Sequence, residues 1–181
     1  MWRELDRLDS AVYAAIAETP TPALDRAFRD LSRAADHSKL WLASAAVLSC
    51  AGGARGRRAS ENGLASVAVT ASVVNLLLKP IVRRRRPDRP AHGIPVGRTV
   101  RMPLSKSFPS GHSASAFAFA TGVARVWPEA GAPLFVLATL VGYSRVHTGV
   151  HYPIDVVAGS LTGVLLAPLA AAGVRRHRGR C

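Results

Sequence analysis

The chain has 181 residues, enough for one domain, with 49% hydrophobic residues and a formal net charge of +13. This balance favours a nucleic acid, a membrane surface or a phosphorylated substrate as partner. Aromatic residues make up only 6% and no Lys/Arg-Gly-aromatic signature is present, so we expect no nucleic-acid partner. Cys50 and Cys181 form neither a CxxC pair nor a Cys/His cluster, which argues against a structural zinc site.

Residues 1–38 predict amphipathic helices rather than a membrane span. The apolar face of the first helix comprises Trp2, Leu5, Leu8, Val12 and Ile16. A second helix is predicted to begin at Pro22, with Thr21 as its N-cap. We expect both helices to lie in the membrane interface or to cover a helical bundle. A contact within a homo-oligomer is the alternative.

Five apolar stretches follow: Leu40–Ala54, Gly63–Leu78, Ser113–Val126, Ala130–Tyr143 and Val156–Val174. Several are shorter than the ~20 residues of an ideal span, so a soluble helical core is the alternative. The breaks between them are charged or rich in Pro and Gly, and small residues within them allow close helix packing. The predicted fold is therefore all-α, a membrane bundle of about five short transmembrane helices over residues 39–175, with a basic tail at 176–181.

The order of the stretches places the polar clusters on one side of the membrane. Lys79 ends the second helix, His112 starts the third, and Ser144–Asp155 joins the fourth to the fifth. The segment "ARGRR" (Ala54–Arg58) and the basic tail lie on the other side. The segment Arg83–Gly111 has no helical pattern, and a connection of that length often carries function.

The segment "SFPSGH" places Ser110, Gly111 and His112 at the start of an apolar helix. Free N–H groups and the positive end of the helix dipole form an anion site there. Gly111 allows close backbone approach, Ser110 adds a hydroxyl donor, and His112 can transfer a proton. The alternative is an ordinary serine N-cap followed by an incidental histidine.

The segment "YSRVHTGVHYPID" carries Arg145, a fork-shaped donor suited to phosphate. His151 and Asp155 are four residues apart and share a helical face. An aspartate bonded to one ring nitrogen leaves the other nitrogen free as a base or nucleophile. A metal site formed by His147, His151 and Asp155 is the alternative, but the cationic surroundings disfavour a divalent ion, so we expect no metal.

The segment "KPIVRRRRP" places Lys79, Arg83 and Arg86 on one face if the helix continues to Arg86. Pro87 then ends the helix. We predict that Lys79 and Arg86 bind phosphate and that Arg83 contacts a second phosphate or headgroup. The two remaining arginines of the run, Arg84 and Arg85, are predicted to face lipid and water.

Together, these three segments resemble the motifs of the type 2 phosphatidate phosphatase and vanadium haloperoxidase superfamily. "KPIVRRRRP" matches Lys, six residues, Arg-Pro, and "PSGH" stands at Pro109–His112. "SRVHTGVHYPID" matches Ser-Arg, five residues, His, three residues, Asp. The motifs span Lys79–Asp155 in the family's order, without a departure.

The resemblance implies that His151 attacks phosphorus to form a phosphohistidine, with Asp155 orienting its ring. His112 would protonate the leaving oxygen. The residues implied to bind the phosphoryl oxygens are Lys79, Arg86, Ser110, Gly111 and Arg145. No cofactor or metal is implied, because these cations supply the charge that Mg²⁺ supplies elsewhere.

The expected substrate is a lipid phosphate whose tail stays in the bilayer. A polyprenyl phosphate, a polyprenyl diphosphate or a prenyl-linked sugar phosphate is favoured over phosphatidate or phosphatidylglycerol phosphate. The alternatives are a vanadate-dependent haloperoxidase and a non-catalytic basic membrane adaptor. We expect a multi-pass protein of the bacterial cell membrane. The catalytic side carries more arginines, but when the charges needed for catalysis are discounted, "ARGRR" and the tail face the cytoplasm and the active site faces outward, as the resemblance also implies.

Overall fold

A computed structural model describes residues 2–178, which contain helices and loops but no strand. The helices are α1 (Trp2–Glu18), α2 (Pro22–Ala34), α3 (Lys39–Ala51), α4 (Gly53–Val73), α5 (Lys79–Val82), α6 (Gly111–Ala124), α7 (Pro128–His147) and α8 (Pro153–Arg178). A π-helical turn, Val74–Leu78, joins α4 to α5. Short 3₁₀ turns comprise Asp36–Ser38, Pro90–His92 and Val96–Arg98. The predicted all-α fold is confirmed.

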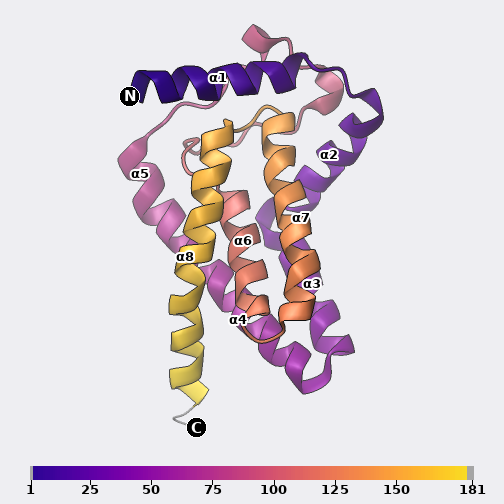
Figure 1. The fold of residues 1–181 in the computed structure, drawn as a ribbon, viewed down its shortest axis with the longest axis vertical. Helices are drawn as coiled ribbons and strands as arrows, with labels where there is room; N and C mark the ends of the chain where they lie inside the picture. The colour runs from indigo at the N-terminus through magenta and orange to yellow at the C-terminus, as the bar shows by residue number, and fades with distance from the viewer. Residues whose placement is uncertain (1, 179–181) are drawn as a thin grey trace.

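Helix α6 lies at the centre of the bundle and packs against α4, α7 and α8 (Figure 1). Glycines make this packing close. A Cβ at Gly122 of α6 would lie 2.7 Å from the carbonyl oxygen of Asn62 in α4. A Cβ at Gly159 of α8 would lie 2.4 Å from the carbonyl oxygen of Ser110, where α6 begins. The small residues seen in the sequence are thus the surfaces at which the helices meet.

The core is apolar, and so is much of the outer surface. Trp41, Phe119 and Val141 are fully buried in one cluster between the helices. Leu76 of the π-helical turn and Leu165 of α8 are more than 70% exposed. Two helical segments, Gly53–Val82 and Pro153–Ala170, are long and apolar enough to cross a membrane. An apolar exterior around a tightly packed bundle is the arrangement expected in lipid.

Two predicted boundaries are wrong, both in the second apolar helix. Helix α4 begins at Gly53, so "ARGRR" lies in its first turns and not in a loop. At the other end α5 stops at Val82, and Arg83 takes a left-handed conformation with φ of 53°. Arg83 and Arg86 therefore do not share a helical face with Lys79. In the predicted tail, α8 continues to Arg178, and residues 179–181 lie outside the described part.

Helix α1 lies across the end of the bundle at which α6 and α8 begin (Figure 1). Tyr13 and Ala17 are buried there against Ile94 and Val146. Other apolar side chains of α1, among them Leu8, remain exposed. This helix is amphipathic, as predicted, and it covers the loops that connect the bundle helices at this end.

We predict that Gly159→Ala destabilises the protein, because the new methyl group overlaps the Ser110 carbonyl oxygen, a backbone atom. Overpacking of this kind costs about 1–3 kcal/mol, more than alanine gains in helix propensity. The measurement is thermal unfolding in detergent. Gly173→Ala in the same helix is the control, because a Cβ there meets no atom of the described residues within 4 Å. Equal melting temperatures for the two variants would contradict the prediction.

Candidate active site

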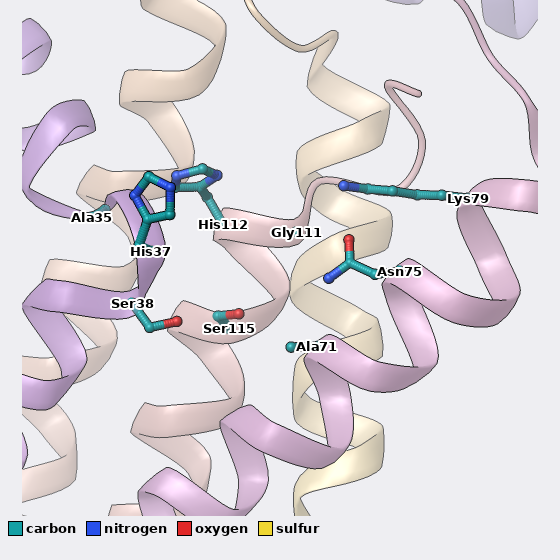
Figure 2. Close-up of a pocket in the computed structure, with 9 residues that line it drawn as sticks. All are labelled: Ala35, His37, Ser38, Ala71, Asn75, Lys79, Gly111, His112 and Ser115. Atoms are coloured by element: carbon teal, nitrogen blue, oxygen red, sulfur yellow. The ribbon is translucent and has the colours of Figure 1, made fainter. Parts of the chain in front are cut away.

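The three motif segments meet at the end of the bundle covered by α1. The side chain of Lys79 extends toward Gly111, and a Cβ on Gly111 would lie 3.5 Å from Lys79 Nζ. A cavity of about 180 Å³ opens beside them, with His37 and His112 on one side and Lys79 on the other (Figure 2). Its further lining residues are Ala35, Ser38, Ala71, Asn75 and Ser115.

His151, in the connection after α7, and Asp155, in the first turn of α8, form a buried pair. His151 Nδ1 lies 3.4 Å from Asp155 Oδ2, and the Asp155 side chain has no exposed surface. The Tyr152 N–H donates to the same oxygen at 3.0 Å, and the Ser107 hydroxyl donates to it as well. Because α8 begins at Pro153, Asp155 also lies in a first turn, where the helix dipole favours a carboxylate. We therefore assign the ring proton to Nδ1, which leaves a lone pair on Nε2.

The environment of His151 keeps its imidazole neutral. Burial lowers the pKa of His151 to about 3, and repulsion from Arg86 and Arg145 acts in the same direction. The hydrogen bond to Asp155 opposes this shift without cancelling it. At neutral pH the ring is thus uncharged, and its Nε2 lies 3.2 Å from Arg86 Nη1.

Arg86 and Lys79 are held by neutral oxygen atoms. Arg86 donates from Nε to the Ser105 carbonyl at 2.8 Å and from Nη1 to the Val150 carbonyl at 2.7 Å. The Ser105 hydroxyl accepts from Arg86 Nη2 and from Lys79 Nζ, both at 3.2 Å. Burial lowers the pKa of Arg86 to about 10, which leaves it charged at neutral pH. Neither cation is neutralised by these acceptors, so both charges remain available to an anion.

Arg145 lies at the end of α7 and its side chain is 1% exposed. Its Nη1 donates to the Ser32 hydroxyl at 2.5 Å and lies 3.8 Å from Asp36 Oδ1. Its Nε is buried and has no hydrogen-bond partner among the described residues. An unsatisfied guanidinium donor is costly in a buried site, and an anionic oxygen would satisfy it.

The start of α6 is fixed by Ser110. Its N–H donates to the Asp155 carbonyl at 2.9 Å, which ties α6 to the first turn of α8. Its hydroxyl accepts from the Ser113 N–H at 3.4 Å, as an N-cap does. The serine N-cap of the alternative interpretation is therefore present, beside Lys79, and the anion site at this helix start stays a prediction.

His112 has a partner that the sequence did not indicate. Its Nε2 lies 2.8 Å from Asp36 Oδ1. Asp36 opens the turn before α3, in which His37 and Ser38 have left-handed conformations. The hydrogen bond from His112 lowers the pKa of Asp36, although burial opposes it. Nothing in the sequence marks Asp36, because 76 residues separate it from His112.

Two predicted placements, those of Arg83 and Arg84, differ in the structure. Arg83 turns back, and its Nε donates to the Pro80 carbonyl at 3.0 Å. Arg84 does not face lipid or water but binds Asp155. The alternative metal site of His147, His151 and Asp155 is not formed, because His147 binds α2 instead: its Nε2 lies 3.1 Å from Asp25. Among residues 2–178, no group of three His, Cys, Asp or Glu side chains has the arrangement of a metal site.

Residues 62–178 match the family model of the PAP2 superfamily. The chain belongs to this superfamily. The match covers more than half of the chain and contains all three motif segments, so the family predicted from these motifs is confirmed.

Known PAP2 proteins resemble the chain over most of its length. The decaprenylphosphoryl-5-phosphoribose phosphatase of Mycobacterium tuberculosis is 34% identical over 174 residues, which cover 94% of this chain and 91% of the relative. The crystal structure of LpxE from Aquifex aeolicus aligns with a TM-score of 0.69 at 25% identity, covering 90% of this chain and 94% of LpxE. The structure of the transmembrane phosphatidylglycerolphosphate phosphatase from Bacillus subtilis gives a TM-score of 0.72 at 25% identity, covering 96% and 87%.

The PAP2 match begins after α3, whereas the site also draws on earlier residues. Ser32 binds Arg145 and Asp36 binds His112, and both lie before residue 62. The N-terminal helices thus complete a site whose motif residues come from the PAP2 region. Sequence reasoning missed these contacts because neither residue belongs to a local pattern.

We predict that the PAP2 fold loses stability as pH falls from about 6.5 toward 3. Below 6.5, the ordinary pKa of histidine, the unfolded chain gains a proton that buried His151 does not take up until its pKa of about 3. This group alone would lower the free energy of unfolding by about 1.4 kcal/mol per pH unit in that window. His151→Asn should therefore show a shallower loss when unfolding is measured at pH 4, 5, 6 and 7. The same slope in both proteins would contradict a neutral His151.

Proposed function

We propose that this PAP2 protein removes a phosphate from a prenyl-linked lipid, with a prenyl-linked sugar phosphate as the first candidate, through a phosphohistidine. The observation that carries this proposal is the position of the His151 ring between a carboxylate and a guanidinium. Asp155 holds its Nδ1, while Nε2 faces the guanidinium of Arg86. An unprotonated ring nitrogen beside a cation that neutral oxygen atoms hold is suited to attack on an anionic phosphoryl group.

In the first step, His151 Nε2 attacks phosphorus and the bond from phosphorus to the leaving oxygen breaks. For this step His112 must carry a second proton, which it gives to that oxygen, and Asp36, 2.8 Å from His112 Nε2, favours the charged form of the ring. Asp155 stabilises the positive charge that develops on His151. The cations Lys79, Arg86 and Arg145 and the N–H groups at the start of α6 would bind the three phosphoryl oxygens.

In the second step, water attacks the phosphohistidine. Neutral His112 takes a proton from the water, the bond between phosphorus and His151 Nε2 breaks, and inorganic phosphate leaves. The ring returns to its neutral form with its proton on Nδ1. Each group ends in the state in which it began, so the cycle needs no cofactor.

A second cavity supports a substrate with a polar headgroup beyond the phosphate. It has a volume of about 360 Å³ and adjoins His112, on the side expected for the leaving group. Asp36, His37 and Arg101 give it polar walls, and Met102 and Leu104 add apolar surface. A sugar fits such walls, and Arg101 suits a second phosphate. The 34% identity to a phosphatase named for a prenyl-linked phosphosugar agrees with this choice.

The proposed location is the bacterial cell membrane, with five bundle helices crossing it and the site at the outer face. The basic residues at the start of α4 and the end of α8 lie in segments far from the catalytic end (Figure 1). Basic residues of this kind, which have no catalytic task, favour the cytoplasmic side. Named relatives of the chain are bacterial lipid phosphatases, which agrees with this location.

The proposed activity can be tested as phosphate release by purified protein in detergent. The substrates are a polyprenyl phosphosugar, a polyprenyl diphosphate, phosphatidate and phosphatidylglycerol phosphate. We expect the phosphosugar to give the highest kcat/KM. His151→Ala should abolish release from all four, because the nucleophile is lost. His92→Ala is the matched control, because the His92 ring packs edge-on against that of Tyr13 and lines neither of the two cavities described above.

Near-normal turnover by His151→Ala would overturn the mechanism. A preference for phosphatidate would overturn the substrate class and leave the mechanism standing.

We further predict that vanadate inhibits the enzyme and that a chelator does not. Vanadate adopts the five-coordinate geometry of the transferring phosphoryl group and would bind the same cations. EDTA should leave kcat unchanged, because Lys79, Arg86 and Arg145 supply the positive charge of the site. Phosphate release measured with and without each compound decides both points. Loss of activity in EDTA that Mg²⁺ restores would show that the proposed mechanism is incomplete.

A further inference from the structure

Arg84 joins the catalytic aspartate to the N-terminal helix. Its Nη1 donates to Asp155 Oδ1 at 2.8 Å. Its Nη2 donates to Asp9 Oδ2 at 2.7 Å and to Asp6 Oδ1 at 3.2 Å, both on α1. The guanidinium also lies over the ring of Tyr152, 4.3 Å from the ring centroid. One side chain thus bridges α1 and the first turn of α8.

Asp9 makes this bridge rigid. Its side chain is 4% exposed, and its Oδ1 accepts from the Ile154 N–H at 2.8 Å. One carboxylate on α1 therefore binds the start of α8 directly and holds Arg84 with its other oxygen. Charge-assisted hydrogen bonds of this kind fix geometry closely.

The contacts of Arg84 complete those of Asp155. Asp155 Oδ2 faces His151, Ser107 and the Tyr152 N–H, whereas Oδ1 accepts from Arg84. A carboxylate bonded at both oxygens cannot rotate, so Oδ2 stays directed at His151. Removing Arg84 would free one oxygen and leave two buried carboxylates, Asp9 and Asp155, without their shared cation.

The charge balance separates Arg84 from Arg86, two residues away. Although burial opposes it, the hydrogen bonds to Asp9 and Asp155 raise the pKa of Arg84 above its ordinary value. Its terminal nitrogens bind carboxylates, whereas those of Arg86 bind carbonyl and hydroxyl oxygens. A phosphate would be attracted to Arg86 and would find the charge of Arg84 already compensated.

We propose that Arg84 and Asp9 are positioning residues for the reaction, holding Asp155 so that His151 presents Nε2 to phosphorus. Helix α1 is then part of the catalytic apparatus and not only a cover for the bundle. This inference rests on the proposed phosphatase function. Arg84 falls among the six unspecified residues of the first motif, and Asp9 lies outside the matched PAP2 region.

The test compares Arg84→Ala with Arg85→Ala, an exposed neighbour in the same arginine run. We expect Arg84→Ala to lower kcat roughly 10- to 100-fold, as loss of an orienting partner does. The KM and the inhibition constant of vanadate should change by less than about threefold, because phosphate binding is intact. Arg85→Ala should match the wild type in all three quantities.

Two further variants test the same contacts between Asp9, Arg84 and Asp155. Asp9→Asn keeps the size of the side chain, and we expect it to lower kcat less than Arg84→Ala does, again at unchanged KM. In the double variant the two losses should not add, because Asp9 acts through Arg84. Arg84→Lys should recover part of kcat, since one ammonium can reach Asp155 but cannot bridge as the fork does.

A kcat for Arg84→Ala equal to that of Arg85→Ala would overturn the inference. So would a loss confined to KM and vanadate inhibition, which would make Arg84 a phosphate ligand. If Arg84→Ala loses its helical circular dichroism signal, Arg84→Lys and Asp9→Asn decide: wild-type kcat in both overturns the inference. Absence of phosphate release by the wild type would instead refute the proposed function, so the two failures are distinguishable.

Discussion

The burial of the Asp155 carboxylate is the constraint on which the rest of the site depends. A buried carboxylate must be hydrogen-bonded and paired with a cation. Asp155 obtains its partners from the loop at Ser107, the N–H of Tyr152 just before α8, the ring of His151 and the guanidinium of Arg84. Satisfying one side chain therefore draws together the long loop, the connection between α7 and α8, and, through Arg84, helix α1.

The same constraint gives the arginines of the basic run different roles. Carboxylates compensate Arg84, whereas carbonyl and hydroxyl oxygens fix Arg86 without cancelling its charge. Cations held by neutral groups keep their attraction for phosphate and pay little reorganisation when it binds. The left-handed conformation of Arg83 accounts for this difference. The helix ends at Arg83, and the chain beyond it places Arg84 against α1 and Arg86 against His151.

The sequence predicted the bundle and the end at which its motifs meet, because both depend on local patterns. Apolar stretches mark helices, and their order places Lys79, His112 and His151 on one side. The helix end at Arg83 was not predictable, since only Pro87 marks a break and it biases Arg86 alone. Asp9 and Asp36 were missed because their partners are more than 70 residues away in the chain. Their roles arise from packing that no local pattern records.

The central helix of the bundle is short, and this has a consequence for the surrounding lipid. The 14 residues of α6 span about 21 Å at 1.5 Å per residue, against a hydrocarbon core of about 30 Å. Because α4, α7 and α8 pack around α6, a lipid headgroup reaches His112 at the start of α6 only by entering the bundle. The long chain of the proposed prenyl substrate would stay in the hydrocarbon while its phosphate enters.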